Sequence, residues 1–191
     1  MPKFDASTGQ CWVRVYREGV AAAVGHDLVL SVGEFWVEID APNPGIRARF
    51  QADSLRVLGT QSEVDAPGAP GGGLSARDKS KIEQNLQKKV LETHRFAVIS
   101  FESTAVSLRA GHNEAQVRGK LSMHGVEREI RVAVQPGAQE SVARVRLHQP
   151  DFGIAPFRAL MGALKVGAHV DIELRLPLGE DALKGVADGE G

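Results

Sequence analysis

Histidine is the residue type in this sequence best suited to chemistry, and the chain contains six of them. No two are spaced as HxH, HxxH or HxxxH, and there is no CxxC pair, so no local metal-binding motif exists. Ligands that are distant in sequence can still converge in a folded sheet. His26, beside Asp27, and His169 are the candidates for such convergence, although plain surface or hydrogen-bonding roles remain the favoured interpretation of each.

Two further motifs resemble known functional motifs, but the residues around them do not match. GGGLSA (71–76) has the spacing of a dinucleotide-binding loop, but the DAPGAP segment before it is not a buried strand. Asp151 begins a D-F-G string like the kinase magnesium motif, yet the other kinase motifs are missing, so we interpret it as a turn cap. Cys11 lies on the apolar face of a strand-like run and is predicted to be a buried, unreactive thiol. We therefore predict no catalytic residue, no metal ligand and no cofactor.

Charge and composition exclude several classes of partner. The chain has 23 basic and 24 acidic side chains, so no basic excess exists to drive binding to nucleic acid or to anionic lipid surfaces. A single cysteine excludes an intramolecular disulfide. The sequence shows neither a signal peptide nor an apolar run of the ~20 residues needed for a transmembrane segment. We expect a cytoplasmic protein, or a periplasmic one if a signal peptide has been removed, and leave open whether it forms a homodimer.

Alternating apolar and polar residues predict the elements that must position any site. The predicted strands cover 11–17, 26–40, 46–52, 97–110, 115–123, 126–135, 141–148 and 169–178. Gly33 predicts a bulge or bend inside the second of these strands. One helix is predicted over 76–91, with Ser75 and Asp78 resembling a capping box. The Gly- and Pro-rich segment 65–75 is expected to be a mobile loop.

The count of two-faced strands predicts the fold class. About eight antiparallel strands, each with one apolar face, close into a barrel or form a sandwich. From the pattern alone we predict an all-β, antiparallel fold of about eight strands, a barrel or a sandwich, with one inserted α-helix. The whole chain, 1–191, is expected to be a single domain with an ordered barrel over about 11–178 and a frayed tail over 179–191.

Four stretches, in this order, together resemble one family. They are the helix followed by VLETHRFAVISFEST (90–104), the hairpin VRGKLSMHGVEREIRVAV (117–134), QPDFGI (149–154) and HVDIELRL (169–176). In the hairpin, His124-Gly125 forms the turn. These motifs are similar to those of the YceI-like, lipocalin-like family. Together with the strand count, the resemblance implies an all-β, antiparallel, eight-stranded lipocalin-like barrel with one inserted α-helix. It also implies that the tunnel of this barrel takes long apolar molecules such as polyisoprenoids, for carriage or storage.

We therefore predict non-enzymatic binding of a long-chain apolar amphiphile, such as a polyisoprenoid, a quinone or a fatty-acid-like lipid, inside the barrel. The residues predicted to line the binding site are Val13, Val15, Phe35, Val37, Phe50, Phe101, Leu121, Met123, Val132, Val145 and Ile172. Val134 is expected to face the same interior, and His26 and Asp27 are weaker candidates for its mouth. One alternative is a metal-assisted hydrolase built around histidines and Asp27 or Asp151 at the barrel rim. Another is a solid barrel that acts as a protein-interaction module.

Overall fold

The computed structural model of the chain contains one twelve-stranded sheet, and it describes residues 2–19, 26–40, 45–67, 73–108, 114–159 and 164–179. The strands are β1 (Lys3–Asp5), β2 (Gln10–Glu18), β3 (Leu28–Val32), β4 (Phe35–Asp40), β5 (Gly45–Gln51), β6 (Leu55–Thr60), β7 (Val98–Leu108), β8 (Ala115–Met123), β9 (Val126–Gln135), β10 (Ser141–His148), β11 (Arg158–Ala159) and β12 (Leu164–Leu176). The helices are α1 (Gln61–Asp65) and α2 (Ala76–Asn85), and single 3-10 or π-helical turns cover Ala52–Ser54, Leu86–Val90 and Gln149–Phe152. All pairings between the strands are antiparallel, which confirms the predicted all-β antiparallel class.

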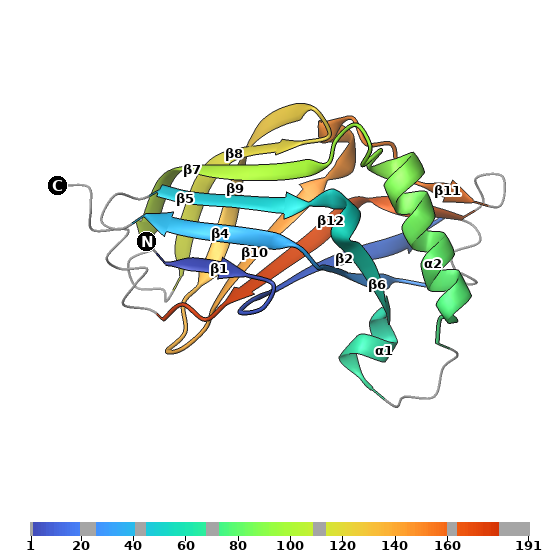
Figure 1. Cartoon of the computed structure of the whole chain (residues 1–191), viewed down its shortest axis with the longest axis horizontal. Coiled ribbons are helices and arrows are strands. Elements are labelled where there is room, and N and C mark those ends of the chain that lie inside the picture. Colours follow the sequence, from blue (N-terminus) through green and yellow to red (C-terminus); the bar gives the residue numbers. More distant parts are fainter. Residues whose placement is uncertain are drawn as a thin grey trace.

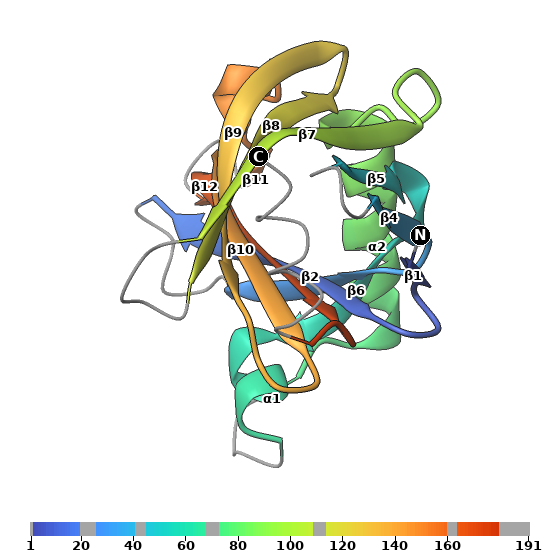
Figure 2. The same ribbon diagram turned by 90° about the vertical axis from the view of Figure 1, so that its left-hand side faces the viewer.

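The sheet is strongly curled around a shared interior. Its strand order is β1-β4-β5-β7-β8-β9-β10-β12-β2-β3-β6, with β11 paired to β12 beside this path. Figure 1 shows the long strands running along the length of the molecule, with α2 near one end and the N-terminus near the other. Seen along that length, the strands curve around a common axis (Figure 2). The buried apolar side chains from these strands form one continuous cluster, as the alternating pattern requires.

The bend predicted at Gly33 is present and separates β3 from β4. The neighbouring chain bends at the same level, where the 3-10 turn Ala52–Ser54 separates β5 from β6. Two hydrogen bonds carry the pairing across this double bend: the Gly33 N–H donates to the Ser54 carbonyl at 3.1 Å, and the Gln51 N–H donates to the Glu34 carbonyl at 2.9 Å. The two neighbouring segments, β3–β4 and β5–β6, therefore bend together, and this shared bend adds to the curvature of the sheet.

The predicted count of eight strands is not confirmed. The run 26–40 is two strands, and β1, β6 and β11 were not predicted. β6 was not predicted because its apolar and polar residues do not alternate regularly: the apolar Leu58 lies on its exposed face, and Gly59 lies on its buried face. β1 and β11 have 3 and 2 residues, too few to show a period.

Helix α2 confirms the predicted helix, but its last turn is π-helical. Ser75 is the N-cap: its hydroxyl accepts from the Asp78 N–H at 3.1 Å and donates to the Asp78 carboxylate at 2.6 Å. That carboxylate does not reach back to the Ser75 N–H, so only half of the predicted capping box forms. Ile82, Leu86 and Val90 pack against the core from one face of the helix.

Polar side chains of the same helix hold it to the edge strand β6. Lys79 Nζ donates to the Leu58 carbonyl at 2.6 Å, and the Glu83 carboxylate accepts from the Val57 N–H at 2.8 Å. These side chains satisfy main-chain groups that a further strand would otherwise bond, so the helix covers an edge of the sheet. The five-residue α1, which was not predicted, follows β6 and begins with a full capping box between Thr60 and Glu63.

The predicted hairpin 115–123/126–135 is present as β8 and β9, joined at His124-Gly125. Both turn residues have positive φ, 53° at His124 and 77° at Gly125. A turn with two such residues matches the twist of the flanking strands.

Two predictions fall wholly or partly outside the described residues. Positions 68–72 of the predicted mobile loop and positions 180–191 of the predicted tail lie there. Among the residues that the structure describes, no helix is long and apolar enough to span a membrane.

Candidate functional site

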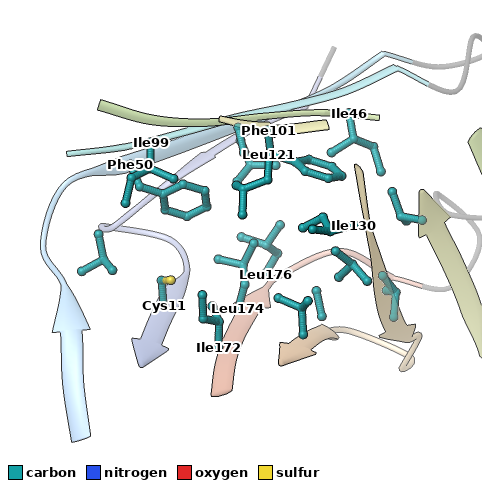
Figure 3. A pocket seen from close by; sticks show the side chains of 18 of the residues that line it. Cys11, Ile46, Phe50, Ile99, Phe101, Leu121, Ile130, Ile172, Leu174 and Leu176 are labelled. Atoms are coloured by element: carbon teal, nitrogen blue, oxygen red, sulfur yellow. The ribbon is translucent and has the colours of Figure 1, made fainter. Parts of the chain in front are cut away.

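The interior of the curled sheet contains a cavity. The centre of a water-sized sphere can move through about 180 Å³ of it, and the whole empty space, including the part open to solvent, is about 1170 Å³. Side chains from two opposite walls point toward one another across this space (Figure 3). The lining residues are Cys11, Val13, Val32, Val37, Ile39, Ile46, Ala48, Phe50, Leu55, Ile99, Phe101, Val117, Leu121, Met123, Ile130, Val132, Val134, Ser141, Ala143, Val145, Leu147, Ile172, Leu174, Leu176 and Leu178.

The pleat of each strand decides which side chains reach the cavity. On β12, Ile172, Leu174 and Leu176 line it, while Asp171 and Glu173 make ion pairs on the other face. Every second residue of a strand points to the same face, so one local pattern along the chain produces both the apolar wall and the polar exterior.

Nine of the eleven residues predicted to bind the ligand line this cavity. They are Val13, Val37, Phe50, Phe101, Leu121, Met123, Val132, Val145 and Ile172. Val134 also lines it, as expected from the alternation on β9. Their contact with a ligand remains a prediction.

The other two predicted residues lie beside the cavity but not in its wall. Phe35 is 6% exposed and stacks on Phe50, with 5.8 Å between the ring centroids. Val15 is half-buried and packs against the core cluster. Both side chains point to the apolar face, but Phe35 is the first residue of β4, at the bend, and Val15 pairs with Leu28 and Val170, which do not line the cavity either.

Sequence reasoning missed several lining residues. Val32 and Leu55 come from the two sides of the double bend, and Leu55 belongs to the strand that was not predicted. Leu174, Leu176 and Ile130 follow the same alternation as residues that were predicted, so the signal for them was present in the sequence. Leu178 lies beyond the end of β12, and no periodic signal marks it.

The described wall offers almost no polar chemistry. Ser141 is its only hydroxyl, and that hydroxyl already donates to the Leu178 carbonyl at 2.6 Å. Cys11 is 3% exposed, and burial raises the pKa of its thiol to about 12, so the thiol stays protonated and is a poor nucleophile. The predicted burial of Cys11 is confirmed. The cavity can exclude water and accept apolar surface, and the Cys11 thiol is the one titratable side chain of its described wall.

A glycine shapes one wall of the cavity. A Cβ added to Gly119 on β8 would lie 2.5 Å from Cζ of Phe101, which is on the neighbouring strand β7. The added Cβ would also overlap the Glu102 main-chain oxygen, so a side chain at this position would force the backbone or the ring to move, and Gly119 leaves room for Phe101.

The turn between β8 and β9 packs against two other segments of the chain. Leu91, Phe152 and Ile154 in those segments are buried members of the core cluster. The His124 ring sits among these segments: its Nε2 is 3.2 Å from the Glu92 carboxylate, its Nδ1 is 3.3 Å from the Phe152 carbonyl, and its ring centroid is 4.3 Å from that of Phe96. The hairpin tip thus fastens two other segments, in addition to its predicted role as a turn.

Of the residues predicted for a rim enzyme, only His169 and Asp151 come together, each beside His148. His26 is exposed, and the Asp27 carboxylate accepts from the Arg17 N–H at 2.8 Å. Asp151 is not the turn cap that we predicted; its carboxylate is 2.9 Å from His148 Nδ1. Within the described ranges, no group of three or more His, Cys, Asp or Glu side chains could hold a metal ion.

Ion pairs cover the outer face of β10, β12 and β2. Arg146 binds both oxygens of Asp171, at 2.7 and 2.8 Å, and the Tyr16 hydroxyl donates to Asp171 at 2.6 Å. The hydrogen bond from Arg146 is the main reason why the pKa of Asp171 lies below its ordinary value. The pKa of Tyr16 is raised, first by partial burial and then by the neighbouring carboxylate. These contacts are structural, since each charged group is already matched.

Comparison with known proteins gives one family and several solved structures. The family model for the YceI-like domain matches residues 31–178. The solved structure of BcnA from Burkholderia cenocepacia is 14% identical, with a TM-score of 0.60, over 90% of this chain and 97% of that one. The YceI protein of Campylobacter jejuni is 10% identical, with a TM-score of 0.46, over 72% and 77% of the two chains. A search among curated proteins finds no significant match. At these identities, the likeness to BcnA shows the fold alone.

Proposed function

The chain belongs to the YceI-like domain family, and we propose that it binds and carries or stores a long-chain apolar amphiphile in its cavity. The family is known for binding hydrophobic ligands such as polyisoprenoids. A polyisoprenoid, an isoprenoid quinone or a fatty-acid-like lipid would each suit a wall of this composition.

The observation that carries the proposal is the cavity wall, which is apolar apart from one hydroxyl that is already bonded. Each methylene group that moves from water into such a space contributes about 0.8 kcal/mol. An unbranched or isoprenoid chain can therefore bind tightly without specific polar contacts. The space open to the centre of a water-sized sphere, about 180 Å³, is far above the about 10–15 Å³ that one water molecule needs, so the interior is hollow, although it is smaller than the about 300–1,000 Å³ of typical small-molecule sites.

The same wall supports a non-enzymatic role. Acid–base or nucleophilic catalysis needs a positioned titratable group at the bound molecule. The described lining provides only the Cys11 thiol, which burial keeps protonated. The hollow also favours ligand binding over the alternative of a solid barrel that serves only as a protein-interaction module.

The first experiment is to extract the purified protein with organic solvent and to analyse the extract and the native protein by mass spectrometry. A co-purifying lipid of defined mass, in near-stoichiometric amount, is the expected result. Delipidated protein should then bind a fluorescent long-chain probe, and the natural lipid should displace that probe.

A pair of variants tests whether the probe occupies this cavity. Leu121→Trp places a large ring in the wall, so probe binding should be lost while the delipidated protein keeps its stability within about 1 kcal/mol. Lys120→Trp is the control: it adds the same ring at the adjacent position on the exposed face of β8, and this variant should bind the probe normally. The proposal fails if the parent protein neither carries a lipid nor binds a probe, and if Leu121→Trp instead costs about 1–3 kcal/mol, as in a solid core.

Two finer predictions from the sequence remain to be tested with the same material. A cytoplasmic location can be checked by cell fractionation, and the oligomeric state by light scattering of the eluted protein.

A further inference from the structure

Two histidines lie side by side on the outer face of the sheet, away from the cavity. His148 on β10 and His169 on β12 are register partners in the antiparallel pair. Their ring centroids are 4.8 Å apart, and the ring planes are inclined by 41°. Leu147, the neighbour of His148 in the chain, lines the cavity, so His148 points outward by alternation. His169 is exposed, so both rings can be reached from solvent.

Asp151 fixes the orientation of the first ring. Its carboxylate oxygen Oδ1 is 2.9 Å from Nδ1 of His148. A carboxylate can only accept, so in the neutral ring Nδ1 carries the proton and Nε2 keeps a free lone pair. Histidines that ligate metals are held in this way, with one nitrogen donating to a carboxylate or carbonyl and the other facing the ion.

The charges around the pair are largely compensated. Arg146, two residues before His148 on the same face of β10, is bound to both oxygens of Asp171, which lies two residues after His169 on β12. Arg128 donates through Nε to the main-chain carbonyl of Asp151 at 3.1 Å. No hydrogen bond occupies the His169 ring in the part of the chain that the structure describes.

We propose that His148 and His169 together bind one borderline transition-metal ion, with Asp151 as a positioning residue and water in the remaining coordination positions. Two imidazole ligands suit Cu²⁺, Ni²⁺ and Zn²⁺, whereas Mg²⁺ and Ca²⁺ prefer oxygen. Affinity should follow the general order for such ligands and be highest for Cu²⁺. The site has two protein nitrogens, not the three or more ligands of a structural zinc site, so we expect reversible binding. It is independent of the proposed function in the cavity.

Calorimetric titration of tag-free protein with Cu²⁺, Zn²⁺ and Mg²⁺ tests this site. The expected result is one equivalent of Cu²⁺ and of Zn²⁺ bound, with no Mg²⁺ binding. His148→Gln and His169→Gln should each weaken binding by about tenfold or more, because removing even a group that orients a ligand has an effect of about that size. His94→Gln, which changes another exposed histidine in the same way, should leave the affinity unchanged.

Electron paramagnetic resonance of the Cu²⁺ complex provides a second readout. The parent spectrum should show coupling to two imidazole nitrogens, and each single variant should lose one of them. Asp151→Asn should keep both nitrogens but bind more weakly, which separates a positioning residue from a ligand. The proposal is overturned if the parent protein does not bind Cu²⁺, or if either His148→Gln or His169→Gln binds as tightly as His94→Gln. Circular dichroism of each variant checks that the fold is kept.

Discussion

The two faces of β12 are stabilised in different ways, although the same thirteen residues form both. The inner face places Ile172 and Leu174 against the cavity. On the outer face, Asp171 bonds Arg146, and Glu173 bonds Arg144 at 2.8 Å. The inner face depends on keeping water and charge away, whereas the outer face depends on pairwise contacts that solvent partly screens.

This difference implies unequal tolerance to substitution. A partly exposed ion pair contributes about 0–1 kcal/mol, because water competes for both partners. An unpaired charge on the inner face has no partner and loses its hydration, which costs several kcal/mol. Neighbouring positions on one strand should therefore respond very differently to the same change.

The largest effect is expected for Val37→Asp on β4, where the parent side chain is 2% exposed. The buried carboxylate should lower the free energy of unfolding by about 3–5 kcal/mol or prevent folding. Trp36→Asp, next in the chain and 36% exposed, is the matched control and should cost much less. Urea denaturation followed by circular dichroism measures both, and equal losses would contradict an inward-facing apolar wall.

Loading and removing the ligand should act through the inner face alone. A long-chain ligand at about one hundred times its Kd should stabilise the protein by about 2.7 kcal/mol. The measurement is the Tm of delipidated protein with and without added lipid. The Asp171→Asn variant should show the same gain as the parent protein, since its change lies on the outer face. A different stabilisation by the lipid in Asp171→Asn would contradict the conclusion that ligand binding involves the inner face alone.

A smaller effect is expected for Asp171→Asn itself. The variant leaves Arg146 without its bidentate partner and Tyr16 without its charged acceptor. We expect the free energy of unfolding to fall by about 1 kcal/mol. This is less than for a fully buried ion pair, because Asp171 is 28% exposed and solvent weakens the interaction. Urea denaturation at neutral pH measures the loss. Arg131→Gln, on an exposed position of β9, serves as the control for removing one charge from the outer face.

The stabilisation by Asp171 should be lost at low pH. The pKa of Asp171 is lower in the folded protein, chiefly because Arg146 bonds its carboxylate. A lowered folded-state pKa stabilises the protein above the unfolded-state value of about 4, and this stabilisation is lost as the pH falls further through the folded-state pKa. The difference in unfolding free energy between the parent and Asp171→Asn should therefore narrow below about pH 4. A constant difference from pH 7 to pH 3 would show that the carboxylate charge is not its source.

The smallest effect is expected for Lys120→Ala. Lys120 pairs with Glu127 across the β8/β9 hairpin at 3.3 Å, but both side chains are more than half exposed. We expect a change below about 0.5 kcal/mol, close to the resolution of urea denaturation. A loss of more than 1 kcal/mol would mean that pairs on the outer face are stronger than their exposure suggests.

The errors of prediction occur where a local signal was weak or where a distant segment decided the outcome. The hairpin of β8 and β9 was predicted to the residue because its alternation is regular and its turn is marked by His124-Gly125. Strand β6 was missed because Gly59 and the exposed Leu58 break its pattern. Val15 and Phe35 were placed correctly on the apolar face of their strands but do not line the cavity. The alternation of residues shows which face a side chain points to, but it does not show whether that side chain reaches the cavity.

The sequence by itself determined which face of each strand is apolar, because the two-residue period is a property of the local backbone. It also determined the family, through short motifs whose order is preserved. Only the tertiary structure decided that the apolar faces leave a hollow, since curvature and the gap between opposite walls depend on all the strands together. It also decided that His148 lies opposite His169. Strand register joins residues that are distant in sequence, and no local period encodes it.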